Sequence, residues 1–97
     1  MTPKRLAKLK GELAKLRRAP RKAAELEKLA RKLGRRRVKR GGEPMWESAE
    51  FPELFVLAIP HHGGRDLAIG TQKSILDQLE EDVLAWEVRL NEHNDEE

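Results

Sequence analysis

Residues 54–59, with the sequence LFVLAI, form a continuous apolar run that ends at Pro60. Strands are rich in β-branched and aromatic residues, and proline cannot donate a hydrogen bond to a neighbouring strand. The run therefore predicts a strand that stops at Pro60, and we expect it to be the best-buried strand of a sheet. Two histidines and two glycines follow at residues 61–64 and predict a tight loop.

Two further strands are predicted before this run. Residues 35–40, with the sequence RRRVKR, lie between glycine signals, and we interpret them as a strand whose Val38 faces the core. Gly41-Gly42 then closes a hairpin into a second strand at residues 45–48, where Trp46 is predicted to be a core residue. Pro52 marks the next turn. Three consecutive strands of this kind predict an antiparallel sheet.

Three helices are predicted around the strands. Leucines spaced by three and four predict a basic amphipathic helix over residues 4–18, which ends before Pro20. A second helix is expected over residues 21–33, with Gly34 as its left-handed cap. The last helix is expected to begin near Gly70 with Thr71 as its N-cap, and to bury one apolar stripe. The order of elements predicts an α+β domain of two layers, with the helices on one face of the sheet.

The net charge of +3 conceals two halves of opposite sign. Residues 1–42 carry +14, and residues 43–97 carry −11. A half with so much positive charge is expected to bind polyanions such as RNA, with an affinity that falls as salt rises. Two other interpretations stay open: the acidic half folds back on the basic half, or it receives a basic partner.

Composition excludes several classes of site. The 97 residues include no cysteine, which excludes disulfides, thiolate metal sites and cysteine nucleophiles. Histidines and carboxylates do not recur at the spacing of a metal site, so we expect no metal and no cofactor. The chain contains no apolar run near the length of a membrane span and no signal peptide, so a cytoplasmic location is expected.

Between about residues 23 and 83 the sequence resembles the HicA family, small bacterial toxins that cleave RNA. The matching features, in order, are Leu33-Gly34 before a basic strand, Ile59-Pro60-His61-His62 at the end of the third strand, and Gly70-Thr71 with Ile75-Leu76 in the final helix. The resemblance implies an α-β-β-β-α unit shaped like a double-stranded-RNA-binding domain. The chain then divides into a basic N-terminal helix (1–20), a HicA-like domain (21–91) and an acidic tail (92–97), which we expect to be disordered.

The same resemblance implies a function, an mRNA endoribonuclease of a toxin–antitoxin pair that a HicB-type antitoxin neutralises. His62 occupies the family's Pro-x-His position and is the candidate catalytic acid or base of a metal-independent cleavage. The family's catalytic histidine usually lies in a Gly-Ser-His motif, which here falls on Gly42-Glu43-Pro44. Proline has no proton to transfer, so the sequence leaves cleavage of RNA and binding without cleavage both open.

Cations around these motifs are the candidate RNA ligands. Those of the basic strand are expected to contact phosphates and 2′-hydroxyls, namely Arg35, Arg36, Arg37, Lys39 and Arg40. Arg65, Thr71 and Lys73 are expected to hold a phosphate at the start of the last helix. The alternative interpretations are a solvated edge strand whose charges prevent aggregation, and an ordinary helix cap beside two surface cations.

Two alternative functions belong to other classes. One is a non-catalytic RNA-binding module on the same fold, which Pro44 favours. The other is a protein-interaction domain, in which the basic helix of residues 4–18 and the acidic last helix mediate assembly. This second alternative predicts a homo-oligomer that dissociates when residues 1–20 are removed.

Overall fold

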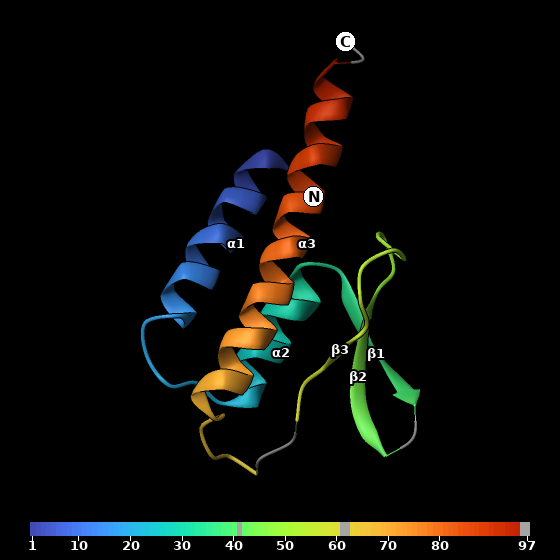
Figure 1. The fold of residues 1–97 in the computed structure, drawn as a ribbon. Helices are drawn as coiled ribbons and strands as arrows, with labels where there is room; N and C mark the ends of the chain where they lie inside the picture. The colour runs from blue at the N-terminus through green and yellow to red at the C-terminus, as the bar shows by residue number, and fades with distance from the viewer. Residues whose placement is uncertain (41, 61–62, 96–97) are drawn as a thin grey trace.

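Three helices and three strands make up the described part of the chain, which comprises residues 1–40, 42–60 and 63–95 of a computed structural model (Figure 1). In chain order they are α1 (Pro3–Leu16), α2 (Ala23–Lys32), β1 (Arg35–Arg40), β2 (Glu43–Ser48), β3 (Leu57–Ala58) and α3 (Ile69–Asp95). This order confirms the predicted α+β arrangement, in which a three-stranded antiparallel sheet follows two helices and precedes a third.

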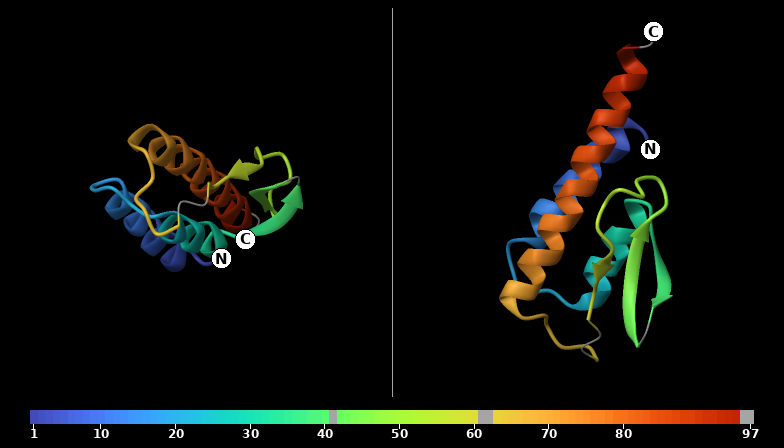
Figure 2. Two further views of the ribbon diagram at one scale, coloured as in Figure 1. Left: turned by 90° about the horizontal axis from the view of Figure 1, so that it is seen from below. Right: turned by 45° about the vertical axis from the view of Figure 1, so that its right-hand side comes forward.

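The strands form one sheet in the order β1-β2-β3. In its register Arg37 lies opposite Trp46, and Trp46 lies opposite Leu57. Residues that face each other across antiparallel strands point to the same side of the sheet, so these three positions share one face. Trp46 and Leu57 are buried, and the helices lie on their side of the sheet (Figure 2). The molecule therefore has the predicted two layers.

Val38 points away from the helices, and the prediction that it faces the core was wrong. It lies opposite Met45, one residue along from the pair of Arg37 and Trp46, and is half-buried on the outer face of the sheet. Successive side chains alternate between the two faces of a strand, and the inward positions of β1 begin at Arg35, which is buried. Val38 was predicted to face inward because it is the one apolar residue of β1, but the inward positions are taken by arginine and lysine.

Strand β3 lies within the predicted run of residues 54–59 but is shorter than predicted. Only Leu57 and Ala58 pair with β2, and Leu54 instead closes a turn, its N–H donating to the carbonyl of Phe51 at 3.0 Å. Leu57 and Ile59 are buried, whereas Phe55 is 78% exposed. The run was expected to be the best-buried strand of the sheet, and the exposure of Phe55 shows that it is not buried throughout.

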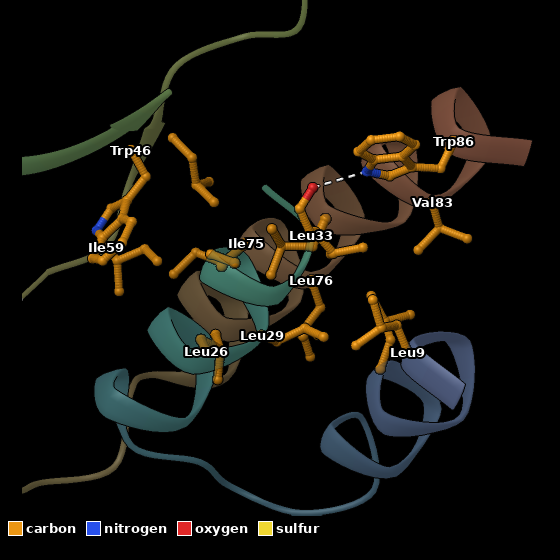
Figure 3. Packing of buried hydrophobic residues seen from close by; sticks show 14 of the residues in the cluster. Leu9, Leu26, Leu29, Leu33, Trp46, Ile59, Ile75, Leu76, Val83 and Trp86 are labelled. Carbon is orange, nitrogen blue, oxygen red and sulfur yellow. Dashed lines mark hydrogen bonds between the residues drawn. The ribbon is translucent and has the colours of Figure 1, made fainter. Parts of the chain in front are cut away.

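The core lies between the three helices and the inner face of the sheet (Figure 3). The predicted leucine stripe of α1 is confirmed as buried at Leu6, Leu9 and Leu13. Trp86 of α3 donates its indole N–H to the carbonyl of Leu33 at 2.8 Å, which ties α3 to the end of α2. Gly34 follows with φ of 100°, as predicted for a left-handed cap, because other residues are strained there.

Helix α3 begins earlier and ends later than predicted. It starts at Ile69, and the N–H of Gln72 donates to the carbonyl of Ala68 at 2.9 Å, so Thr71 lies inside the first turn and is not the N-cap. At its other end the helix continues to Asp95, into the tail for which disorder was predicted. Neither glycine nor proline interrupts residues 71–95, so nothing in the sequence stops the helix after its apolar stripe ends.

Candidate nucleic-acid interface

Two connecting segments meet at the end of the molecule where β2 begins, which we call the hairpin end. They are the α1–α2 loop and residues 63–68 before α3, both in the lower part of Figure 1. The N–H of Leu67 donates to the carbonyl of Arg21 at 2.8 Å, and Lys22 forms a β-bridge with Asp66. The N–H of Ile59 donates to the carbonyl of Pro44 at 3.4 Å. Backbone contacts thus join the α1–α2 loop to residues 66–67, and the start of β2 to Ile59.

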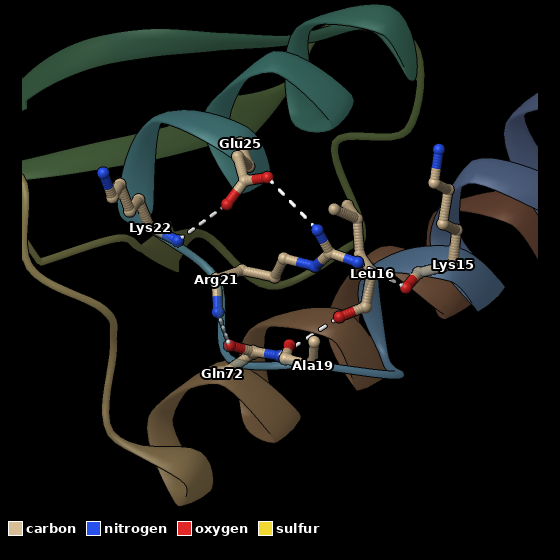
Figure 4. Close-up of polar contacts among 7 residues, drawn as sticks. All are labelled: Lys15, Leu16, Ala19, Arg21, Lys22, Glu25 and Gln72. Atoms are coloured by element: carbon tan, nitrogen blue, oxygen red, sulfur yellow. Dashed lines mark hydrogen bonds and ion pairs between the residues drawn. The ribbon is translucent and has the colours of Figure 1, made fainter.

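Gln72 fixes the α1–α2 loop against α3 (Figure 4). Its side-chain N–H groups donate to the carbonyls of Leu16 and Ala19 at 3.1 and 2.9 Å, and its amide oxygen accepts from the N–H of Arg21 at 2.7 Å. The residue is only 8% exposed. Sequence reasoning missed this role, although a glutamine one turn before the buried Ile75 and Leu76 is a signal for a polar residue on the inner side of a helix.

Arg21 extends the same network on the side of α2. Its guanidinium donates to the carbonyl of Lys15 at 2.9 Å and to the carboxylate of Glu25 at 3.4 Å. The other carboxylate oxygen of Glu25 accepts from the N–H of Lys22 at 2.9 Å, which satisfies a free amide at the start of α2. Figure 4 shows these contacts beside those of Gln72. The helix start is therefore capped by Glu25.

Arg35 is a core residue, and its predicted contact with RNA does not fit this structure. Its side chain is 0% exposed and forms a bidentate pair with Asp82 of α3, with N–O distances of 2.7 and 2.8 Å. The guanidinium also donates to the carbonyls of Trp46 and Phe55 at 2.9 Å each. Burial raises the pKa of Asp82, while the hydrogen bonds from Arg35 act to lower it. Arg35 thus joins the sheet to α3.

The other predicted cations of β1 lie on the surface. Arg36 points to the outer face and pairs with Glu47, its neighbour across the strands, at 3.0 Å. Arg37 and Lys39 are exposed, and neither forms an ion pair with another residue that the structure describes. The side chain of Arg40 lies outside the described part of the chain. Of this set, Arg37 and Lys39 are the residues best placed to meet a ligand.

The cations near the start of α3 do not form the predicted phosphate site. Arg65 is exposed, but Lys73 pairs with Asp77 at 2.9 Å, as Arg17 does at the same distance. The hydrogen bonds from Lys73 and Arg17 lower the pKa of Asp77. Thr71 lines a groove between β3 and α3 and does not cap the helix. His62, the candidate catalytic residue, lies outside the described residues.

Arg31 of α2 is a cation that sequence reasoning did not single out. Its guanidinium lies over the ring of Trp46, 4.8 Å from the ring centroid, and Trp46 is opposite Arg37 in the sheet. We call the exposed residues Arg31, Arg37 and Lys39 the α2–β1 strip. Trp46 is 0% exposed, so it is a core residue that supports the strip and cannot stack on a base.

The acidic half folds back on the basic half, which answers the question that composition left open. Residues of α3 pair with α1, with the residue that follows it and with β1: Glu87 with Lys10 at 2.7 Å, Asp77 and Glu80 with Arg17, and Asp82 with Arg35. Helix α3 thus neutralises the cations that face it.

Many cations of the basic half keep their charge exposed. Ten exposed basic residues of α1, α2, β1 and the α1–α2 loop form no ion pair with another described residue: Lys4, Arg5, Lys8, Lys15, Arg18, Lys22, Lys28, Arg31, Arg37 and Lys39. A surface with this surplus attracts polyanions.

Two kinds of site are absent from the described residues. Within these ranges no group of three or more histidine, aspartate or glutamate side chains is arranged to hold a metal ion. The described helices also include none that is long and apolar enough to span a bilayer. Comparisons of the chain with protein-family models, with curated proteins and with solved structures find no match.

Proposed function

We propose that this protein is a HicA-like RNA-binding protein that holds RNA on the α2–β1 strip and the hairpin end. The observation that carries the proposal is the distribution of unpaired charge. Helix α3 neutralises the cations that face it, yet ten exposed basic residues of the basic half keep no acidic partner among the described residues. Phosphates are the ligands that such a surface attracts most strongly.

The arrangement of the elements supports the family resemblance. The α2-β1-β2-β3-α3 part has the helix, strand, strand, strand, helix order expected of a unit shaped like a double-stranded-RNA-binding domain. The Leu33-Gly34 step ends α2 and leads directly into β1. Proteins of this class recognise RNA by its shape, through contacts to phosphates and 2′-hydroxyls. We therefore expect RNA binding with little dependence on sequence.

Cleavage of mRNA is the second candidate function, and one contact favours it. Pro44 occupies the position of the family's catalytic histidine, and its carbonyl accepts a hydrogen bond from Ile59, the residue before Pro60-His61-His62. Pro44 of the first motif and Ile59 of the second are thus neighbours in space. In this proposal the 2′-oxygen loses its proton and bonds to the adjacent phosphorus, while the bond from phosphorus to the 5′-oxygen of the next nucleotide breaks. That 5′-oxygen leaves protonated, a 2′,3′-cyclic phosphate remains, and His62 serves as the base or the acid of these proton transfers. A HicB-type antitoxin is the expected partner of such a toxin.

The binding proposal is tested with variants of the α2–β1 strip. Fluorescence anisotropy with a labelled RNA duplex is measured for the wild type and for Arg37→Gln/Lys39→Gln. Each lost phosphate contact makes the negative slope of log K against log salt shallower by about 1. The double variant is therefore expected to bind more weakly, with a slope shallower by about 2. Arg36→Gln is the matched control, because Arg36 is already paired with Glu47 on the outer face.

The control separates this proposal from a general charge effect. Arg36→Gln and each single change at Arg37 and Lys39 remove the same charge. If all three lower the affinity for RNA equally, net charge alone determines binding and the α2–β1 strip is not the binding surface.

The cleavage proposal is tested with a long RNA in EDTA, analysed on a denaturing gel. The wild type is expected to shorten the RNA, and His62→Ala is expected to leave it intact while still binding it. Binding by both proteins without any product would leave the non-catalytic module as the function. Cleavage that persists in His62→Ala would assign the chemistry to another residue.

A further inference from the structure

A groove with a volume of about 320 Å³ lies between α1 and α2. Its lining comes from both helices and from the loop that joins them: Glu12, Lys15, Leu16, Arg21, Glu25, Lys28, Leu29 and Lys32. Four of these side chains are cations and two are carboxylates, so positive charge is in excess. A concave surface with one sign of charge in excess attracts ions of the other sign. The α1–α2 groove therefore favours an anion.

The two carboxylates of the groove already have basic partners. Glu12 accepts two hydrogen bonds from the ammonium group of Lys32, at 3.0 and 3.2 Å. Glu25 accepts from the guanidinium of Arg21 and from a main-chain N–H at the start of α2. Because both acids are engaged, the other cations of the groove keep their charge.

Lys15 and Lys28 are the cations with no acidic partner. Both are exposed, and neither forms an ion pair with another residue that the structure describes. Lys15 belongs to α1 and Lys28 to α2, so they come from opposite walls of the groove. A lysine ammonium is a point charge with three donors, and phosphate oxygens are among its usual ligands. Two ammonium groups on facing walls suit a small anion with several oxygens.

Arg21 lines the same groove and has donors that its partners in the protein do not use. A guanidinium has five N–H groups. This one donates to the carbonyl of Lys15 at 2.9 Å and to Glu25 at 3.4 Å, and the second distance is long for a hydrogen bond (Figure 4). Its Nε is buried and has no acceptor among the described residues. Buried donors are normally satisfied, so Arg21 has capacity for a further acceptor.

We propose that the α1–α2 groove binds a phosphate group, held by the ammonium groups of Lys15 and Lys28 and by the guanidinium of Arg21. The phosphate belongs either to a small phosphorylated molecule or to the backbone of RNA, and the second case rests on the proposed function. Lys28 and Arg31 are three positions apart on α2 and are therefore neighbours on its surface. The groove thus adjoins the α2–β1 strip, and an RNA held by the strip can continue into it.

Titration of the ¹⁵N-labelled full chain with sodium phosphate, followed by NMR, tests this site against sodium chloride of equal ionic strength. Phosphate is expected to shift main-chain amides beside the groove and to saturate there. Lys15→Gln/Lys28→Gln is expected to weaken phosphate binding by about tenfold or more. Lys4→Gln/Lys8→Gln is the matched control, because it removes the same charge from exposed, unpaired lysines of α1 that do not line the groove. The control is expected to bind phosphate as the wild type does.

All four substituted lysines are exposed, and thermal melting by circular dichroism verifies that both variants fold. Equal loss of phosphate binding in the two double variants would overturn the proposal, because net charge alone would then explain the binding. Shifts spread over all exposed cations, without saturation in the groove, would overturn it as well.

Anisotropy with labelled RNA distinguishes the two sources of the phosphate. If Lys15→Gln/Lys28→Gln lowers RNA affinity more than the control does, the groove holds a phosphate of the RNA backbone. If the two variants bind RNA equally, while only the control keeps phosphate binding, the ligand is a small phosphorylated molecule. A wild type that binds phosphate in the groove but no RNA would contradict the proposed function and would leave the phosphate site in place.

Discussion

Arg35 and Asp82 are adjacent in space but 47 positions apart in sequence, and both are almost completely buried. Removing two charges from water is costly, and their mutual attraction offsets that cost only while both partners are present. Asp82→Asn leaves the arginine buried without its counter-charge. We expect this variant to lose about 3–5 kcal/mol of the free energy of unfolding, measured by urea denaturation.

The neighbouring Arg36 provides the matched comparison. It also pairs with an acidic residue, but its side chain is 69% exposed, and exposed pairs contribute about 0–1 kcal/mol. Arg36→Met should therefore unfold at nearly the wild-type urea concentration. The double variant Arg35→Met/Asp82→Leu is expected to regain only part of the loss, because the carbonyls of Trp46 and Phe55 lose their donor. Equal stability of Asp82→Asn and Arg36→Met would refute this account.

The residue scale is also where the sequence was least informative. A run of six residues with five cations predicts a solvated strand, and nothing within it distinguishes Arg35 from Arg37. The distinguishing signal lies in α3, where Asp82 is three residues after Leu79 and four before Trp86, on the buried stripe. An acid in that position needs a buried partner. Arg37, Lys39 and Arg65 are exposed, as a role in RNA binding requires, whereas Arg35, which was also predicted to contact RNA, is buried.

At the scale of elements, α1 is part of the domain core and not an appendage. Its leucines pack into the same cluster as those of α2 and α3. We expect Leu9→Ala, at a position 2% exposed, to cost about 2–5 kcal/mol of the free energy of unfolding. Leu84→Ala, on the exposed side of α3, should change it by about 0.5 kcal/mol or less. Urea denaturation of both variants decides this, and a small loss at Leu9 would make α1 a peripheral helix.

The elements themselves were largely predictable, because their hydrophobic period is a local signal. The leucine spacing of α1, the glycine cap at Gly34 and the apolar stripe of α3 were each confirmed. The boundaries were less predictable. The turn that Leu54 closes with Phe51 leaves only Leu57 and Ala58 in β3, and α3 begins before Thr71, with Gln72 in its first turn. The contacts of the Gln72 side chain with the α1–α2 loop join residues distant in sequence and give no local signal.

At the scale of the whole molecule, positive and negative charges lie on different surfaces. Acidic residues of α3 are used in pairs with the cations that face them, and the cations on the outer surfaces of α1, α2 and β1 stay unpaired. The net charge of +3 therefore understates the positive potential at those surfaces. We expect RNA affinity to fall steeply with salt, with a slope of log K against log salt of about −3 or steeper. Anisotropy titrations between low and physiological salt measure it. A slope near zero would show that binding is not electrostatic.

The hydrogen bonds of Gln72 to the α1–α2 loop have a consequence for how this protein can diversify. All three reach main-chain atoms, at Leu16, Ala19 and Arg21. Hydrogen bonds that reach only main-chain atoms do not depend on which side chains the loop residues carry. Exposed positions of the loop, Arg18 among them, are therefore open to substitution without altering the path of the chain. Related proteins are expected to keep the glutamine and to vary the loop charges, adjusting their affinity for a polyanion while the framework stays constant.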